Sequence, residues 1–218
     1  MPKTVTARLV EWKEIVQWCS AIAEKVMNSE FRPDVIVGMA RGGWVPSRLV
    51  CDELIVKNLI SVKTQHWGMT ATRDGKAVLS SGISENLQGK RVLIVDDITD
   101  TGESIRLAFE HVKSLGPEET KCAAMLHISH SKFVPDYYAE EVNAAKWKWF
   151  VFPWNYNEDI AAFITGILSD SQKTLSEISD LLRADNGITL SEKQLLTTLV
   201  RFSKLGIVSR TGGLWRKN

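Results

Sequence analysis

The sequence lacks the features that mark membrane and secreted proteins. It has no run of 18 apolar residues, so no segment is long enough to cross a bilayer as a helix. Its first residues, MPKTVTARLVEWKEI, do not have the pattern of a secretory leader. A net charge of +1 provides no overall field that would attract nucleic acid or an anionic membrane, so either partner would need a local patch. We therefore expect a cytoplasmic protein with no membrane partner and no nucleic-acid partner.

Cysteine is also scarce. Cys19, Cys51 and Cys122 are odd in number, widely spaced and without a CxxC pair, which argues against disulfides and cysteine-rich metal sites. We expect buried free thiols in a reducing cytoplasm. The remaining composition is that of an ordinary globular protein, with 44% hydrophobic and 24% charged residues. A chain of 218 residues can form one large domain, or a medium domain with a small appendage.

Apolar runs and amphipathic helices alternate along the first 150 residues. Helical spacing of apolar residues predicts helices at residues 8–29, 45–56 and 104–115. Short apolar runs predict strands at residues 34–38, 60–64, 91–95, 120–128, 137–141 and 149–152. This alternation predicts an α/β fold, with a mostly parallel sheet flanked by helices on both faces. Residues 65–89 are polar and contain several glycines, and we expect either a solvated hairpin or a flexible catalytic lid.

The last third of the chain has a different pattern. Three helices are expected, at residues 157–169, 174–184 and 191–205. Thr174 and Ser191 are typical N-caps for the second and third of them, and Gly212-Gly213 suits the turn of a short hairpin. We therefore expect two domains, residues 1–156 and residues 157–218, of which the second is small and all-α. This second domain resembles a winged-helix module, or acts as a cap over the first.

The most informative segment is Val92–Ser104, VLIVDDITDTGES. A buried strand delivers two adjacent acids, Asp96 and Asp97, at its carboxyl end, and a Thr-Gly turn then leads into a helix. Such a turn presents backbone N–H groups and hydroxyls in front of the positive end of the helix, which makes it a phosphate cradle. The two carboxylates can accept hydrogen bonds from a ribose diol. Helix capping alone would explain one or two of these residues, but not the acid pair together with DTGES.

This segment resembles the phosphoribosyl pyrophosphate (PRPP) motif of type I phosphoribosyltransferases. The flanking sequence, over about residues 8–158, resembles the 6-oxopurine branch of that family, or an archaeal-type adenine enzyme derived from it. The resemblance implies a type I phosphoribosyltransferase fold and a pentosyl transfer from PRPP to a purine base. It also implies Mg²⁺ as the cofactor and a homodimer as the assembly.

The resemblance assigns roles to individual residues of the motif. Asp96 and Asp97 would hold the ribose hydroxyls, and Asp100 would lie near purine N7 as the general acid or base. Mg²⁺ would bind through PRPP, with Asp97 as a candidate protein ligand. The 5-phosphate would be bound by Thr99, Asp100, Thr101, Gly102, Glu103 and Ser104.

A glycine-rich turn, GMARGG at residues 38–43, follows the first expected buried strand. Its glycines let the backbone approach an anion, and Arg41 supplies a fixed positive charge. Such a turn is by itself more often structural, but one βα unit before the PRPP motif it resembles the pyrophosphate loop of the family. The resemblance implies that Ala40, Arg41 and Gly42 bind pyrophosphate and that the Ala40–Arg41 peptide bond is cis.

Residues 147–155, which include KWFVFPW, resemble the nucleobase segment of the family. The resemblance implies that Trp149 stacks on the base and that the backbone of Phe150 reads its edge. Ile98 and His127 would also lie at the base. Without the other motifs, an aromatic strand of this kind would be assigned to a hydrophobic core.

One departure from the family bears on the choice of base. The 6-oxopurine enzymes place a lysine shortly before the base segment, where it donates to O6. The corresponding position here is Val134 or Ile128, neither of which can donate, and Lys132 matches neither place. A site without this donor favours adenine, whose exocyclic amine needs an acceptor. We therefore expect purine salvage with adenine as the base, and hypoxanthine, guanine or xanthine as the alternative if Lys132 reaches the base.

A function of another class stays open. From residue 201 onward the chain contains basic residues and no acid: Arg201, Lys204, Arg210, Arg216 and Lys217. Three helices followed by a hairpin with such a patch would also suit a PRPP-sensing regulator that binds DNA. Against this hypothesis, the last helix begins with Glu192 and is rich in leucine, which leaves few polar groups for reading bases. The sequence therefore favours the enzyme.

Overall fold

The computed structural model describes residues 5–66 and 77–218. Arg73 and Lys76, in the expected lid, lie outside the described residues. The contacts divide the chain into two compact units, Trp12–Trp147 on the one hand and Lys148–Asn218 with the chain up to Glu11 on the other. The ends of the first unit, Trp12 and Trp147, differ from the expected domain boundary at residue 156. The division into the domains 1–156 and 157–218 stays a prediction.

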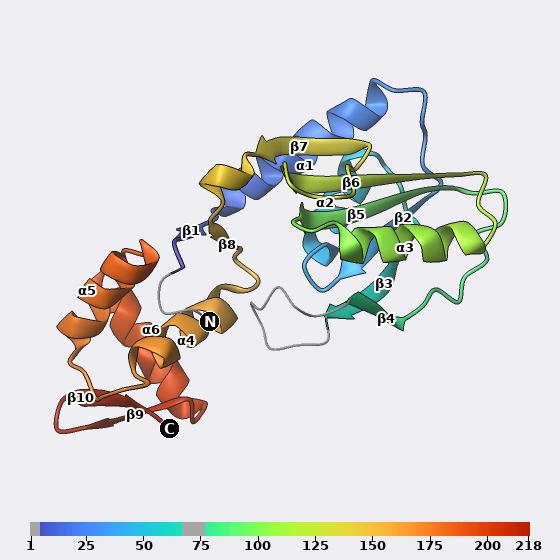
Figure 1. Cartoon of the computed structure of the whole chain (residues 1–218). Helices are drawn as coiled ribbons and strands as arrows, with labels where there is room; N and C mark the ends of the chain where they lie inside the picture. The colour runs from blue at the N-terminus through green and yellow to red at the C-terminus, as the bar shows by residue number, and fades with distance from the viewer. Residues whose placement is uncertain (1–4, 67–76) are drawn as a thin grey trace. The chain divides into compact units, whose positions relative to one another are not determined.

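A six-stranded sheet forms the centre of the Trp12–Trp147 unit, with the strand order β4-β3-β2-β5-β6-β7 (Figure 1). All neighbouring strands are parallel except β4, which pairs antiparallel with β3. The strands are β2 (Val35–Ala40), β3 (Leu59–His66), β4 (Ala77–Ser81), β5 (Arg91–Thr99), β6 (Glu119–Ile128) and β7 (Tyr137–Val142). The helices are α1 (Trp12–Met27), α2 (Trp44–Glu53) and α3 (Glu103–Ser114), with a 3-10 turn η1 (Ala144–Lys146) near the end.

Helices cover both faces of this sheet, with α3 on one face and α1 and α2 on the other (Figure 1). Central strand β5 is therefore buried on both sides, and Leu93, Ile94 and Val95 are fully buried. A strand without an exposed face needs apolar residues at every position, which explains the continuous run that identified it in the sequence. Helix α3 contributes its buried residues Ile105, Ala108 and Val112 to the core on its side.

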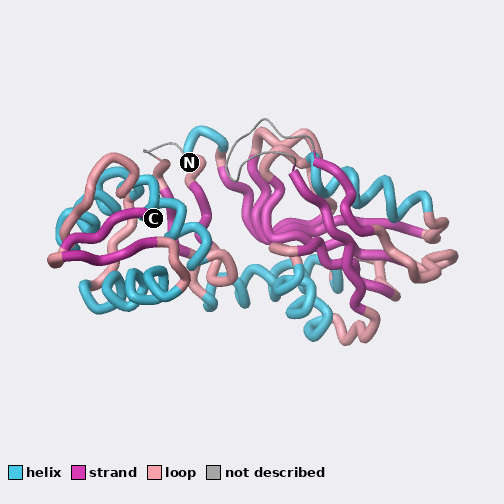
Figure 2. The backbone as a smooth tube through the Cα atoms, turned by 90° about the horizontal axis from the view of Figure 1, so that it is seen from below, coloured by secondary structure: helices cyan, strands magenta, loops and turns pink. Residues whose placement is uncertain are grey.

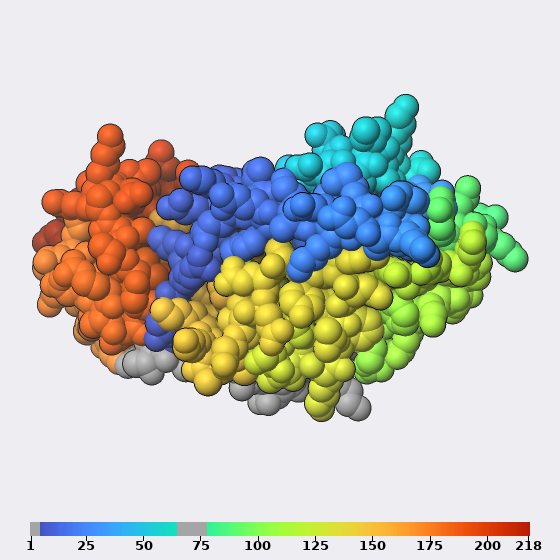
Figure 3. Space-filling model, turned by 90° about the horizontal axis from the view of Figure 1, so that it is seen from above, coloured from blue at the N-terminus to red at the C-terminus, as the bar shows by residue number. Residues whose placement is uncertain are grey.

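Helix α1 lies beside edge strand β7, and Figure 3 shows the blue surface of the helix next to the yellow surface of the strand. The ring N–H of Trp18 donates to Glu140 at 3.2 Å, and the Lys25 amine donates to the carbonyl of Tyr138. These contacts cover one side of the last parallel strand. An exposed strand edge would otherwise invite pairing with another chain.

The expected elements of this unit are found within a few residues of their predicted bounds. Within the expected polar segment 65–89, residues Ala77–Ser81 form strand β4, which pairs antiparallel with β3. The main correction concerns the start of the first helix. Residues Ala7–Leu9 form strand β1, which pairs parallel with β8 (Trp149–Val151), and the helix begins only at Trp12.

The other unit combines this small β1–β8 sheet with helices and a terminal hairpin (Figure 2). The helices are α4 (Tyr156–Ile167), α5 (Leu175–Asn186) and α6 (Glu192–Lys204). Strands β9 (Val208–Thr211) and β10 (Leu214–Lys217) pair antiparallel, so the hairpin expected around Gly212-Gly213 is present and adds strands to the helices. Thr174 and Ser191 both cap their helices, as predicted, each in a reciprocal capping box.

Cys19, Cys51 and Cys122 are buried and free, as expected from their spacing. Burial raises the pKa of Cys19 to about 12 and that of Cys51 to about 11. Both thiols therefore stay protonated at neutral pH and act as small apolar side chains. Among the described residues, no helix is long and apolar enough to cross a membrane.

Candidate active site

Two buried acids lie near the carboxyl end of the central strand of the sheet. Asp96 and Asp97 lie in the carboxyl-terminal half of β5, and the two residues are 9% and 8% exposed. The backbone N–H of Asp97 donates to Asp96 Oδ1 at 2.9 Å, and that of Ile98 donates to Asp97 Oδ1 at 2.8 Å. Burial and the neighbouring charge of Asp97 raise the pKa of Asp96 well above its ordinary value. The pair is therefore poised to receive hydrogen-bond donors or a cation.

The glycine loop after β2 packs directly against one of these acids. A Cβ atom added to Gly42 would lie 2.0 Å from Asp97 Oδ2, and one added to Gly43 would lie 2.5 Å from the carbonyl oxygen of Val95. Only glycine allows this approach. The Ala40–Arg41 peptide bond is cis, as the family resemblance implied. The predicted pyrophosphate loop and the predicted ribose acids are therefore neighbours.

The turn after β5 leads directly into α3. Gly102 is the N-cap of this helix, with a left-handed φ of 81°, and Glu103 and Ser104 are its first two residues. Gly102 has no side chain to cap the helix, and the hydroxyl of Thr101 accepts a long hydrogen bond of 3.4 Å from the N–H of Glu103. N–H groups of a first helical turn have no partner within the helix, so this end suits an anion.

Thr99 faces away from this cradle. Its hydroxyl lies 2.9 Å from His127 Nδ1 and 3.5 Å from the carbonyl oxygen of Leu126, and the residue is almost fully buried. Its hydroxyl thus helps to join β5 to β6. Binding of the 5-phosphate by Thr99 stays a prediction. If Thr99 contributes, its backbone N–H is a better candidate than its hydroxyl.

The turn that follows β6, at residues 129–132, packs against the turn between β5 and α3. The N–H of Lys132 donates to the carbonyl oxygen of Thr101 at 3.2 Å, and a Cβ atom on Gly102 would lie 2.6 Å from Ser131 Oγ. His130 Nε2 lies 2.7 Å from Asp100 Oδ1, an oxygen that is buried and accepts no hydrogen bond with good geometry from the described residues. Sequence reasoning did not pair His130 with Asp100, because residues 30 positions apart meet only through the pairing of β5 with β6.

His127 and Ile98, both predicted at the base, occupy paired strands. His127 is 4% exposed, and its ring centroid lies 5.1 Å from that of Tyr138. Burial is the largest influence on the pKa of His127 and lowers it, which favours the neutral form of the ring. Ile98 is half-buried. Contact of either residue with a base stays a prediction.

Trp149 and Phe150 lie on β8, in the other unit. There the Arg8 guanidinium lies 5.7 Å from the ring centroid of Phe150, and the rings of Phe152 and Trp154 stack with centroids 4.9 Å apart. The segment is therefore an aromatic cluster supported by β1. Stacking of Trp149 on a purine stays a prediction.

Metal binding by protein side chains alone has no support in the described part of the chain. No group of three or more His, Cys, Asp and Glu residues there could hold an ion. Any divalent cation at the acid pair would need further ligands from a substrate.

Comparisons with known proteins agree with this arrangement. The sequence model of the family described as "Phosphoribosyl transferase domain" matches residues 5–160. Over 154 residues the chain is 29% identical to a xanthine-guanine phosphoribosyltransferase of Cereibacter sphaeroides, covering 67% of this chain and 85% of that relative. Over 146 residues it is 26% identical to the xanthine-guanine phosphoribosyltransferase of Idiomarina loihiensis, with coverage of 67% and 85%.

A solved structure is also similar. The purine phosphoribosyltransferase from Pyrococcus horikoshii Ot3 has 35% sequence identity and a TM-score of 0.59, over 68% of this chain and 93% of that one. The family match, the relatives and the strand–turn–helix geometry at the end of β5 agree. The chain therefore belongs to the phosphoribosyltransferase family.

Proposed function

We propose that this phosphoribosyltransferase joins a 6-oxopurine base to the ribose 5-phosphate of PRPP. The bond between C1′ and the pyrophosphate oxygen breaks, a bond from C1′ to a ring nitrogen of the base forms, and the base loses a proton. The observation that carries the proposal is the meeting of three elements: the acid pair, which suits a diol, and two elements that suit anions, the glycine loop against Asp97 and the helix start at Gly102.

Each part of PRPP has a matching element. The acid pair Asp96 and Asp97 suits the ribose diol, and the turn Asp100–Gly102 with the start of α3 suits the 5-phosphate. The loop Ala40–Gly42 suits pyrophosphate because it adjoins Asp97. The sugar gains positive charge as its bond to pyrophosphate lengthens, and fixed carboxylates nearby stabilise that charge.

Asp100 is the candidate general acid or base. It lies on the same turn, with His130 Nε2 at 2.7 Å from its Oδ1. A carboxylate at that place could take the proton that the base loses. His130, on the turn after β6, places its ring nitrogen beside this carboxylate.

The donor set at the end of β5 fits Mg²⁺. This ion prefers oxygen ligands and commonly takes one or two carboxylates while substrate phosphates supply the rest. Asp97 is the candidate protein ligand. Burial and the charge of Asp97 raise the pKa of Asp96, and a cation beside the pair would lower it again. When bound, Mg²⁺ would offset the charge of the departing pyrophosphate.

The names of the relatives support a 6-oxopurine base. They are described as xanthine-guanine, hypoxanthine-guanine and xanthine phosphoribosyltransferases. None of these names supports the adenine preference expected from the sequence, so the comparisons favour the alternative. A donor to O6 is then required, and Lys132 is the candidate. It is exposed, and its backbone is fixed beside Thr101 at the edge of the phosphate turn.

Adenine stays the second candidate because of two particular positions. Ile128 is fully buried and Val134 is an apolar residue with 64% exposure, so neither position supplies the donor that a 6-oxopurine needs. If Lys132 does not reach the base, the remaining groups favour an exocyclic amine over a carbonyl.

The deciding experiment is a base panel with PRPP and Mg²⁺, comparing kcat/KM for hypoxanthine, guanine, xanthine and adenine. The proposal predicts that at least one 6-oxopurine exceeds adenine. Lys132→Ala should then lower 6-oxopurine efficiency about 10-fold or more, since an unpaired buried polar group costs about 1–3 kcal/mol. Lys146→Ala, an exposed lysine on η1, is the matched control and should change nothing. Adenine as the best base, with no effect of Lys132→Ala, would overturn the proposal in favour of the second candidate.

The family resemblance implies a homodimer, and the composition implies a cytoplasmic protein. Both stay predictions. Light scattering of the purified chain tests the first, and a mass of about 24.5 kDa would contradict it.

A further inference from the structure

The helices and strands of the C-terminal unit follow one another in an order that is typical of a known class of module. Helix α4 is followed by a single bridging residue, Lys173, then by α5, α6 and the β9–β10 hairpin. Lys173 and Trp215 exchange two backbone hydrogen bonds of 2.9 and 2.8 Å, so Lys173 forms a one-residue antiparallel bridge beside β10. Helix, short strand, two helices and a hairpin is the arrangement of winged helix-turn-helix modules.

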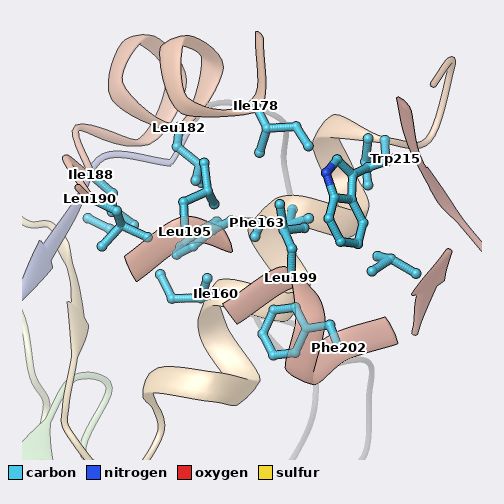
Figure 4. Close-up of a cluster of buried hydrophobic side chains, with 14 of the residues drawn as sticks. Ile160, Phe163, Ile178, Leu182, Ile188, Leu190, Leu195, Leu199, Phe202 and Trp215 are labelled. Carbon is cyan, nitrogen blue, oxygen red and sulfur yellow. The ribbon is translucent and has the colours of Figure 1, made fainter. Parts of the chain in front are cut away.

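A well-packed core fixes α6 in this arrangement (Figure 4). Three residues of α6, Leu195, Leu199 and Phe202, are buried among side chains of α4 and α5, including Phe163 and Leu182. The capping box at Ser191 sets where the helix begins, and Gly187 in a left-handed conformation ends α5. Because these contacts fix the orientation of α6, the side of the helix opposite the core faces outward.

That outer surface is basic. From residue 193 to the end, the chain has six basic residues and no acid. All six are exposed, and none of them forms an ion pair with a carboxylate within the described chain: Lys193, Arg201, Lys204, Arg210, Arg216 and Lys217. A basic surface of this size creates a local positive field that attracts an anionic partner.

The spacing of the outer residues of α6 suits a nucleic-acid groove. Lys193, Thr197 and Arg201 follow each other at intervals of four residues, which aligns them along one side of a helix. Leu196 and Val200 flank them with 37% and 42% exposure. Aliphatic groups among lysine and threonine are unusual on a solvated helix, but in the major groove they contact thymine methyl groups.

The hairpin extends the basic surface beyond the helix. Arg210 and Arg216 lie on opposite strands, and the turn at Gly212-Gly213 has two left-handed glycines with no atom within 4 Å of either added Cβ. A bare turn of this kind lets the backbone approach closely, as binding to a phosphate chain requires.

We propose that the C-terminal unit binds duplex DNA through the outer face of α6 and the β9–β10 hairpin. The sequence-based expectation that nucleic acid is not a partner rested on the net charge of +1 and on a last helix that begins with Glu192 and is rich in leucine. The net charge averages this surface with the rest of the chain, and the leucines at positions 195 and 199 are buried in the core rather than on the outer face. Duplex DNA is the partner because an α-helix fits its major groove, whereas the deep and narrow major groove of duplex RNA excludes one. This binding is independent of the transferase reaction.

The test uses the full chain and a fluorescent DNA duplex of about three helical turns, with binding measured by anisotropy at several salt concentrations. The proposal predicts a non-specific Kd of about 10⁻⁴–10⁻⁶ M at physiological salt and a steep loss of affinity as salt rises. The triple substitution Lys193→Gln, Lys204→Gln and Lys217→Gln should weaken binding about 10-fold or more. It should also reduce the slope of log K against log salt by up to about 3, because each phosphate contact contributes about 0.9.

The matched control removes the same charge elsewhere, with Lys13→Gln, Lys57→Gln and Lys90→Gln, three exposed lysines of the other unit. It should bind DNA as the unaltered chain does. Both triple variants should keep their thermal melts and their transferase activity. Equal losses in both variants, or no binding by the unaltered chain, would overturn the proposal. Equal affinity for duplex RNA would overturn the groove assignment. Self-association that Leu196→Lys abolishes, without DNA binding, would assign the face to a second copy of the chain.

Discussion

At Gly42 the site depends on the absence of a side chain. A single added carbon would lie 2.0 Å from one carboxylate oxygen of Asp97 and 2.6 Å from its Cγ, far inside van der Waals contact. Asp97 is buried and cannot move freely. A methyl group at Gly42 would therefore displace the loop, and with it any pyrophosphate bound there.

Gly42→Ala is expected to raise the KM for PRPP by about 10- to 100-fold, because a displacement of about 1 Å at a binding site can cost that much. Gly166→Ala is the matched control, since nothing lies within 4 Å of the position that its methyl group would occupy in α4. The control should leave kinetics unchanged and raise the melting temperature slightly through better helix propensity. An unchanged KM for PRPP in Gly42→Ala would contradict the role of this loop.

Asp100→Asn keeps the shape of the side chain and removes its basicity. We expect kcat to fall by about 10²–10⁴-fold, the usual contribution of general acid–base catalysis, while the Kd for PRPP stays nearly constant. Single-turnover kinetics and calorimetry measure the two quantities separately. A variant with normal kcat would show that another group handles the proton, and His130, at 2.7 Å from Asp100, would be examined next.

At the scale of elements, strand β5, the turn after it and α3 were predictable because they are contiguous in sequence. An apolar run, two acids, a Thr-Gly turn and a helix each have a local signature. The contacts of the turn with Ser131 and Lys132 had none, because they depend on the pairing of β5 with β6. The same holds for Thr99, whose hydroxyl lies beside His127 rather than in the cradle. Local chemistry thus predicted the strand, the turn and the helix, but not what each side chain contacts.

A further element-scale contact joins the starts of β2 and β5. The Asp34 carboxylate accepts hydrogen bonds from the Arg91 backbone and guanidinium at 2.9, 3.1 and 3.0 Å. The side-chain hydrogen bond from Arg91 is the main reason that the pKa of Asp34 is lowered to about 2. Because the folded-state pKa is lowered, the contribution of Asp34 to stability is complete above the unfolded value near 4 and is lost as pH falls toward 2.

Asp34→Asn should lower the free energy of unfolding at pH 7 by about 1 kcal/mol, a modest figure because both side chains are about one-third exposed. The difference from the unaltered chain should shrink between about pH 4 and pH 2. Urea unfolding at several pH values measures it. The control is Asp52→Asn, whose ion pair with Arg48 is much more exposed and should contribute little. A difference that stays constant down to pH 2 would contradict the assignment.

At the scale of the whole molecule, the division into units follows contacts that no local pattern reveals. Residues Ala7–Leu9 continue the apolar spacing of the helix that follows, so the sequence predicted one helix from residue 8. They form a strand instead because β8 offers a parallel partner. Ala7 pairs with Trp149, 142 positions further along the chain. The N-terminal segment thereby joins the C-terminal helices, where Asn186 donates to the carbonyl of Val5 at 3.1 Å. Pairings at this separation depend on tertiary structure.

The most direct test of the account is a crystal structure of the full chain with PRPP and Mg²⁺ in the absence of a base. The account predicts the ribose hydroxyls at the carboxylates of Asp96 and Asp97, with the pyrophosphate on the loop Ala40–Gly42. It predicts the 5-phosphate on the N–H groups between Asp100 and Ser104. Pyrophosphate density at the start of α3, or a ribose that contacts neither Asp96 nor Asp97, would contradict it.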